Sequence, residues 1–196
     1  MDALLIIDAS PDRFPQSPPQ PLVDLIDRAR GVGGVIVHVA AEAAASEDEV
    51  GATHNGAGQD RFSHNGTEPD TDDAEAGDDA AAAQPQIDSV VGTREDELVL
   101  VSSVPDAFEG VDDLAEGLDD LGVDRIILAG SNGRGALEQS GYAALAIGFE
   151  LVLVRDGLGE GTADPEAASG ADWPAQLEAA GAVLKDGADE IGRAHV

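Results

Sequence analysis

The chain has 196 residues, enough for one domain with a sizeable core, and carries 10 Lys and Arg residues against 40 Asp and Glu residues. The formal net charge of −30 excludes nucleic acids and anionic membranes as partners, because their phosphates would be repelled. The absence of cysteine excludes disulfides, thiolate metal sites and thiol catalysis.

The acidic surface and the near-absence of lysine are typical of a protein from a halophile that accumulates salt. Lys185 is the only lysine of the chain. At molar salt the Debye length is about 3 Å, so repulsion between surface carboxylates is screened. We therefore expect the charge to reflect the solvent rather than the ligand.

The amino terminus predicts a strand. Ala3 to Ile7 is a short apolar run that ends at Asp8, as in a central parallel strand buried on both faces. A signal peptide would need a basic start and a longer apolar run. No apolar run approaches the ~20 residues of a membrane span, so we expect a soluble, cytoplasmic protein.

Apolar runs and helical repeats alternate along the rest of the chain. The predicted strands are 3–7, 35–39, 98–101, 125–129, 149–154 and 182–184. The predicted helices are 22–30, closed by Gly31; 111–121, with Leu114, Leu118 and Leu121 facing inward; 136–147; 173–180; and a terminal turn at 189–194. This order predicts an α/β fold: a three-layer, Rossmann-like parallel sheet of about six strands with helices on both faces.

Residues 43–86 differ in composition from both flanks. They are rich in Ala, Gly, Asp, Glu, Ser and Thr and have few large apolar residues, which predicts a disordered acidic insertion within a single domain, 1–196. His54 and His64 lie among its carboxylates and could capture a divalent metal weakly, but a solvated linker is favoured. We therefore expect no metal and no cofactor.

The predicted strand 125–129 runs into a glycine-rich turn and a helix. In an open α/β sheet ligands bind beyond the carboxyl ends of the strands, so a nucleophile is expected at the start of this helix. Ala136 stands there and offers none. Asn132, Arg134 and Gly135 of the turn are candidates for binding a small anion at the helix-start amides. For Arg134, an ion pair with Glu138, four residues on, is the favoured alternative.

The order of elements, with Asp8 after the first strand, resembles the isochorismatase-like (cysteine hydrolase) family. The matching block is Gly122 to Gly130, then Ala136 six residues later, Ser140, Ala144, Gly148-Phe149 and Val154-Arg155-Asp156. The resemblance covers the chain apart from the insertion. It implies a site built from an aspartate, a lysine and a cysteine.

Two of these three residues are missing. Asp8 matches the aspartate. The lysine falls at Ser102, or at Ser103 if the register slips by one, and the cysteine falls at Ala136. Thiol-based amide hydrolysis is therefore excluded for this chain.

Two functions remain open. The loss of two triad residues favours a degenerate, non-catalytic member that binds a small molecule or serves in assembly. The alternative is cysteine-independent hydrolysis of the isochorismatase type, in which Asp8 protonates a vinyl ether if desolvation keeps a proton on its carboxyl group. The missing lysine would assist by removing a cation. Analogy with homologous folds favours a homodimer, and His38, inside a predicted strand, is expected to be a core residue.

Overall fold

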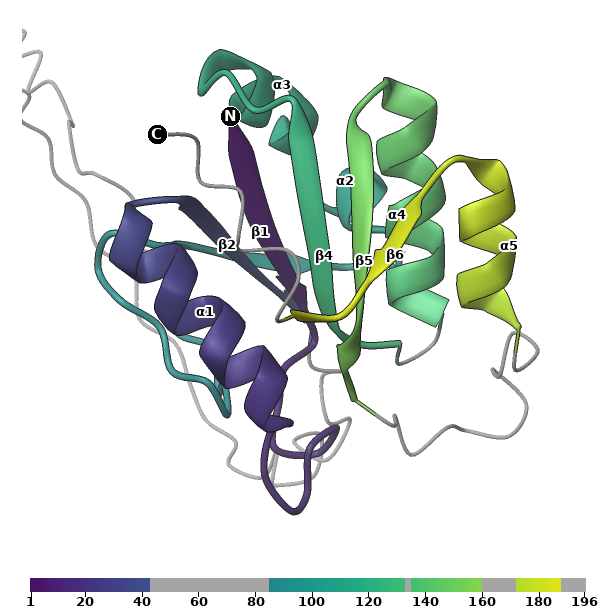
Figure 1. Cartoon of the computed structure of the whole chain (residues 1–196). Coiled ribbons are helices and arrows are strands. Elements are labelled where there is room, and N and C mark those ends of the chain that lie inside the picture. Colours follow the sequence, from purple (N-terminus) through teal and green to yellow (C-terminus); the bar gives the residue numbers. More distant parts are fainter. Residues whose placement is uncertain (43–84, 133–134, 160–171, 188–196) are drawn as a thin grey trace, which may run out of the picture. The chain divides into compact units, whose positions relative to one another are not determined.

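Six strands form one all-parallel sheet, as predicted (Figure 1). The computed structural model describes residues 1–42, 85–132, 135–159 and 172–187. The strand order is β3-β2-β1-β4-β5-β6. The strands are β1 (Asp2–Ile7), β2 (Val35–Ala41), β3 (Leu98–Ser102), β4 (Arg125–Ser131), β5 (Glu150–Gly159) and β6 (Val183–Lys185). The order reverses between β1 and β4, which is where such sheets bind ligands.

Contacts divide the chain into two units, Met1–Glu42 with Gln84–Val196 and Ala43–Ala83. The sheet belongs to the first unit. The predicted insertion at 43–86, with His54 and His64, lies outside the described residues except for residues 85 and 86. The predicted helical turn at 189–194 lies outside them as well.

Helices cover both faces of the sheet. One face packs against α1 (Gln20–Val32), and the opposite face packs against α2 (Ala107–Gly110), α3 (Leu114–Asp120), α4 (Ala136–Ile147) and α5 (Trp173–Ala180) (Figure 1). Because successive side chains of a strand point to opposite faces, β1 serves both cores. Leu4 and Ile6 join the core under α1, while Leu5 and Ile7 join the core under α2–α5.

Several predicted boundaries are wrong, each for a local reason. The helix α1 continues through Gly31 and ends at Gly33, which adopts the left-handed conformation that closes a helix. The predicted helix 111–121 is broken at Asp113, whose φ is +60°, so that only α3 follows. Leu121, predicted to face inward, is 48 % exposed. Strand β5 continues to Gly159, five residues past the predicted end at residue 154.

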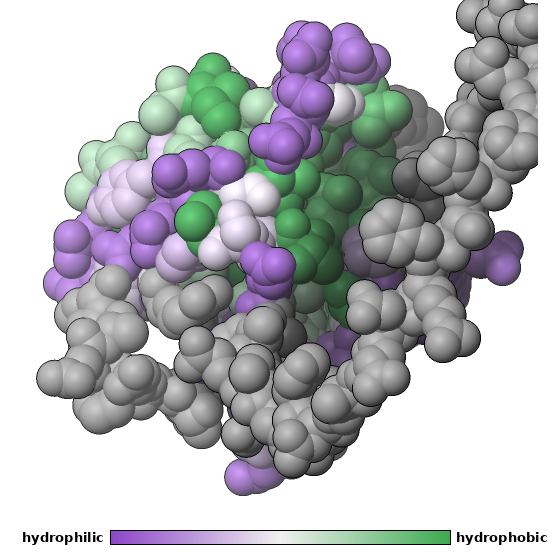
Figure 2. Space-filling view, turned by 180° about the vertical axis from the view of Figure 1, so that it is seen from behind, coloured by the Kyte–Doolittle hydropathy of each residue, from purple (hydrophilic) through white to green (hydrophobic). Residues whose placement is uncertain are grey.

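The face that carries α2–α5 shows hydrophobic residues among hydrophilic ones (Figure 2). The exposed large apolar side chains on its helices and helix ends are Leu121, Tyr142 and Ile147. No helix of the described residues is both long and apolar enough to cross a membrane.

Candidate functional site

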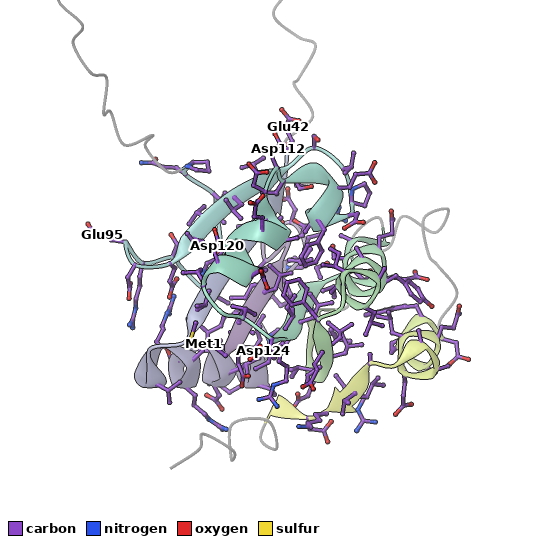
Figure 3. The ribbon with its side chains drawn as sticks, turned by 90° about the horizontal axis from the view of Figure 1, so that it is seen from above. Met1, Glu42, Glu95, Asp112, Asp120 and Asp124 are labelled. Carbon is purple, nitrogen blue, oxygen red and sulfur yellow. The ribbon has the colours of Figure 1, made fainter. Side chains whose placement is uncertain are left out.

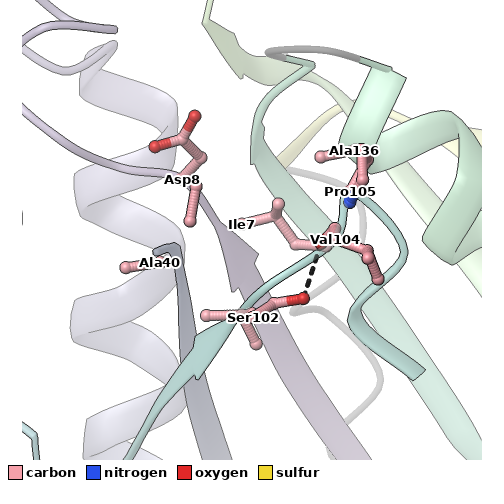
Figure 4. Close-up of a pocket in the computed structure, with 9 residues that line it drawn as sticks. Ile7, Asp8, Ala40, Ser102, Val104, Pro105 and Ala136 are labelled. Atoms are coloured by element: carbon pink, nitrogen blue, oxygen red, sulfur yellow. Dashed lines mark hydrogen bonds between the residues drawn. The ribbon is translucent and has the colours of Figure 1, made fainter. Parts of the chain in front are cut away.

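A small pocket lies at the carboxyl ends of β1, β2 and β3 and at the start of α4 (Figure 4). Its volume is about 10 Å³, about the room that one water molecule needs. The described lining residues are Ile7, Asp8, Val39, Ala40, Ala41, Ser102, Val104, Pro105 and Ala136. The structure therefore brings together Asp8, Ser102 and Ala136, although 128 residues separate the first from the last.

Asp8 is held in a strained turn at the end of β1. Its φ is +49°, in the left-handed region that non-glycine residues rarely adopt, and its backbone N–H donates to the Val39 carbonyl at 2.8 Å. The residue is 7 % exposed. Strain of this kind is typical of functional positions, where the surrounding structure holds it in place.

The Asp8 carboxylate is paired with a cation that the sequence analysis missed. Arg13 Nε donates to Asp8 Oδ2 at 2.8 Å, and Ser10 Oγ donates to Asp8 Oδ1 at 3.1 Å. Arg13 therefore gives Asp8 a cationic partner although a serine stands at the position of the family lysine. The available signal was an arginine five residues after Asp8 in a chain with few basic residues.

Ser102 ends β3 and is buried. Its hydroxyl donates to the backbone carbonyl of Val104 at 2.6 Å (Figure 4). Gly110 of α2 packs so closely that a Cβ there would lie 1.9 Å from Ser102 Oγ. Ser103 is exposed and does not line the pocket. Of the two positions that the register left open, Ser102 is the one at the pocket, with its hydroxyl engaged by the backbone.

Ala136 is the first residue of α4, and its methyl group faces the pocket. Gly135 precedes it at a φ of +75°, a turn that favours glycine. Asn132 has a structural role: its Oδ1 accepts the backbone N–H of Glu138 at 3.1 Å and so caps the first turn of α4. Asn132 and Gly135 are not among the described lining residues, and Arg134 lies outside the described residues.

A second buried cluster lies on the α1 face, at Arg30, His38 and Glu97. Glu97 accepts from Arg30 Nε at 2.6 Å and Nη2 at 3.0 Å, from the Arg94 backbone N–H at 3.0 Å, and pairs with His38 Nε2 at 2.9 Å. His38 is a core residue, as expected, but with an ionic partner. Sequence reasoning missed Glu97, because it lies just before β3 in an acidic stretch that shows no pattern.

Burial and hydrogen bonding act in opposite directions on this cluster. Burial alone raises the pKa of Glu97, but the hydrogen bonds from Arg30, His38 and the Arg94 amide together lower it to about 2. Burial lowers the pKa of His38, and its bond to Glu97 only partly opposes that effect. At neutral pH the cluster thus consists of an ionised carboxylate, a guanidinium and a neutral imidazole.

Known structures share this fold. An N-carbamoylsarcosine amidase from Thermoplasma acidophilum is 17 % identical, with 97 % of this chain and 98 % of that chain covered at a TM-score of 0.62. A pyrazinamidase of Pyrococcus horikoshii in complex with zinc is 21 % identical (94 % and 98 % covered, TM-score 0.62). An isochorismatase from Pseudomonas putida is 22 % identical (95 % and 88 % covered, TM-score 0.60). In the described part of the present chain, no group of three or more His, Cys, Asp or Glu residues is arranged to hold a metal ion.

None of the curated protein sequences matches the chain significantly. A sequence model of the isochorismatase domain, however, matches residues 2–179, most of the chain. The match spans every described strand except β6, as well as Asp8, Ser102 and Ala136. The chain belongs to the isochorismatase family.

Proposed function

We propose that this chain is a non-catalytic member of the isochorismatase family that retains the fold for binding a small molecule or for assembly. One observation carries the proposal: the described pocket residues include no activated nucleophile. Ala136 has only a methyl group, and the Ser102 hydroxyl donates to a backbone carbonyl. An alcohol becomes a nucleophile when a neighbouring base takes its proton, and among the described residues the Ser102 hydroxyl has only backbone carbonyls as partners.

The orientation of Asp8 supports the same conclusion. Its carboxylate points away from Ser102 (Figure 4) and is engaged by Arg13 and Ser10. The Arg13 Nε–Asp8 Oδ2 distance of 2.8 Å is that of a charge-assisted hydrogen bond. The pair is mostly buried, so the solvent screens it less than it would a surface ion pair.

The alternative is cysteine-independent hydrolysis of a vinyl ether with Asp8 as general acid. The burial of Asp8 beside Ala136 favours this alternative. The geometry weighs against it, because a general acid must present its carboxyl group to the substrate, whereas Arg13 Nε and Ser10 Oγ engage both Asp8 oxygens.

An assembly role has some support at the surface. Leu121, Tyr142 and Ile147 are exposed at the ends or along the outer side of α3 and α4. Pairing through these helices would cover them and would give the homodimer expected by analogy.

Turnover measurements test the proposal. The wild-type chain, Asp8→Asn and the surface control Arg28→Gln would be incubated in molar KCl with nicotinamide, pyrazinamide and isochorismate, beside an active cysteine hydrolase as positive control. We expect no turnover above the protein-free rate from any of the three proteins. Turnover by wild type and Arg28→Gln that disappears in Asp8→Asn would establish the alternative. Sedimentation velocity on the same samples tests the assembly role, which a monomer at all concentrations would contradict.

A further inference from the structure

A second small cavity lies on the α1 face of the sheet, beside the pocket of Asp8. It has a volume of about 10 Å³. Its polar side chains come from Ser10, His38, Asp88 and Ser89, and Val39 and Ala40 line both this cavity and the first. We call it the His38 cavity.

One nitrogen of His38 is left without a partner. The ring is 1 % exposed, and its Nε2 lies 2.9 Å from Glu97 Oε2. An ionised carboxylate can only accept, so Nε2 carries the hydrogen of the neutral ring and Nδ1 carries a lone pair. Among the described residues, Nδ1 is buried and has no hydrogen-bond partner. Leaving such a group unsatisfied is unfavourable, because burial removes its hydrogen bonds to water.

Ser89 supplies an independent second observation. Its Oγ is also buried without a partner among the described residues, and Ser89 lines the same cavity. His38 belongs to β2, whereas Ser89 belongs to the segment that leads into β3. The two residues with unpaired polar atoms therefore come from different parts of the chain. Two unsatisfied polar atoms beside a cavity of this size meet the requirements for a bound molecule of one heavy atom.

We infer that the His38 cavity is a binding site for a single water-sized hydrogen-bond donor, water or ammonia, which donates to His38 Nδ1 and bonds to the Ser89 hydroxyl. The volume of about 10 Å³ fits one water-sized molecule. An apolar molecule of that size would leave both polar groups unsatisfied. The inference does not depend on the role of the Asp8 pocket.

The bound molecule would secure the turn that carries Asp8. The Val90 backbone N–H donates to the Ala9 carbonyl at 2.8 Å, so residues 89 and 90 already lie against the chain that follows β1. Ser10, from that same turn, lines the cavity and donates to Asp8. A molecule that joins His38 to Ser89 would hold residues 88–90 against β2 and so restrict the movement of this turn.

Nuclear magnetic resonance on the full-length protein with 15N-labelled histidine tests the inference. We expect the His38 Nδ1 resonance of an unprotonated, hydrogen-bonded nitrogen, and a magnetisation-transfer signal between a long-lived bound molecule and the His38 ring proton next to Nδ1. A signal in ammonium-free KCl identifies water. A signal that arises only when ammonium chloride replaces KCl at alkaline pH identifies ammonia.

Variants distinguish a bound molecule from a direct hydrogen bond between Ser89 and His38. In Ser89→Ala we expect the transfer signal to weaken or disappear, while Ser89→Thr retains it and the exposed control Ser103→Ala leaves it unchanged. Absence of the signal from the wild-type protein with and without ammonium overturns the inference. In that case a His38 Nδ1 shift in Ser89→Ala alone would identify a direct Ser89–His38 hydrogen bond.

Discussion

The Glu97 carboxylate is bonded to groups from three parts of the fold. It is 3 % exposed and joins α1, β2 and the segment before β3 through Arg30, His38 and the Arg94 amide. A buried carboxylate is costly unless its lone pairs are occupied, and here three different groups occupy them. The stability of the α1 face should therefore depend on the charge of this one residue.

The Glu97 cluster predicts a pH dependence of stability. The pKa of Glu97 falls from 4.5 to about 2 on folding, so its contribution is complete above pH 4.5 and is lost as the pH falls through 2. Glu97→Gln should lower the free energy of unfolding by about 3 kcal/mol at neutral pH, with the deficit shrinking in acid. Urea unfolding of both proteins between neutral pH and pH 2 measures this difference in the free energy of unfolding.

The control for this prediction is Glu95→Gln, two residues away. Glu95 is exposed and extends into solvent (Figure 3), so its loss should change stability by no more than about 0.5 kcal/mol. A Glu97→Gln deficit that stayed constant down to pH 2 would contradict the assignment. Because burial also lowers the pKa of His38, wild-type stability should start to decline as the pH falls below 6.5.

A cysteine introduced at Ala136 tests how open the pocket is. The chain has no other cysteine, so Ala136→Cys carries a single thiol. Because Ala136 is buried, this thiol should react with a disulfide reagent at least about tenfold more slowly than that of Ser103→Cys, at an exposed position. Equal rates in the folded proteins would mean that the pocket opens to solvent.

At the scale of elements, regular runs were predictable, but their ends were predictable only where a single glycine marks them. Helices α4 and α5 have the predicted bounds, because a long apolar repeat is followed in each by a glycine. The helix α1 passes through Gly31, since only the second of two nearby glycines, Gly33, takes the left-handed conformation. The break at Asp113 has no glycine or proline to mark it, because Asp112 precedes this residue and Leu114 follows it.

The contact between β1 and β4 depends on a glycine. Gly130 lies opposite Ile7 at a φ of +121°, and a Cβ there would lie 2.1 Å from the Ile7 carbonyl oxygen. Gly130→Ala should therefore destabilise the protein by about 3 kcal/mol or more, since two backbones would have to separate. Thermal unfolding in molar KCl measures the change.

The matched variant is Gly117→Ala in α3. A Cβ at Gly117 meets nothing within 4 Å, and alanine favours a helix by about 0.5–1 kcal/mol over glycine. This variant should be neutral or more stable than the wild type. If both alanine variants changed the stability equally, the close approach of Gly130 to the Ile7 backbone would not explain the loss of stability in Gly130→Ala.

At the scale of the whole molecule, the net charge of −30 predicts a dependence on salt. Exposed carboxylates such as Glu42, Asp112 and Asp120 (Figure 3) repel one another in dilute buffer. We expect the unfolding temperature to rise by about 10 °C or more between dilute and molar KCl, because the Debye length shrinks from about 10 Å to about 3 Å.

Sorbitol at equal osmolality separates screening from the exclusion of cosolute from the protein surface. It should stabilise the protein less than KCl does, because it leaves the repulsion between carboxylates intact. An unfolding temperature that is independent of KCl would contradict both the role of self-repulsion and the halophilic interpretation of the composition.

The sequence by itself determined the alternation of strands and helices, hence the parallel sheet, because apolar periodicity is a local property of the chain. It also excluded thiol chemistry, because no cysteine is present. Only the tertiary structure decided which charges meet. His38 and Glu97 are 59 residues apart and Arg30 and Glu97 are 67 apart, and Arg13 reaches Asp8 only through the turn after β1. Such pairs depend on the path of the backbone between them, which periodicity and composition do not describe.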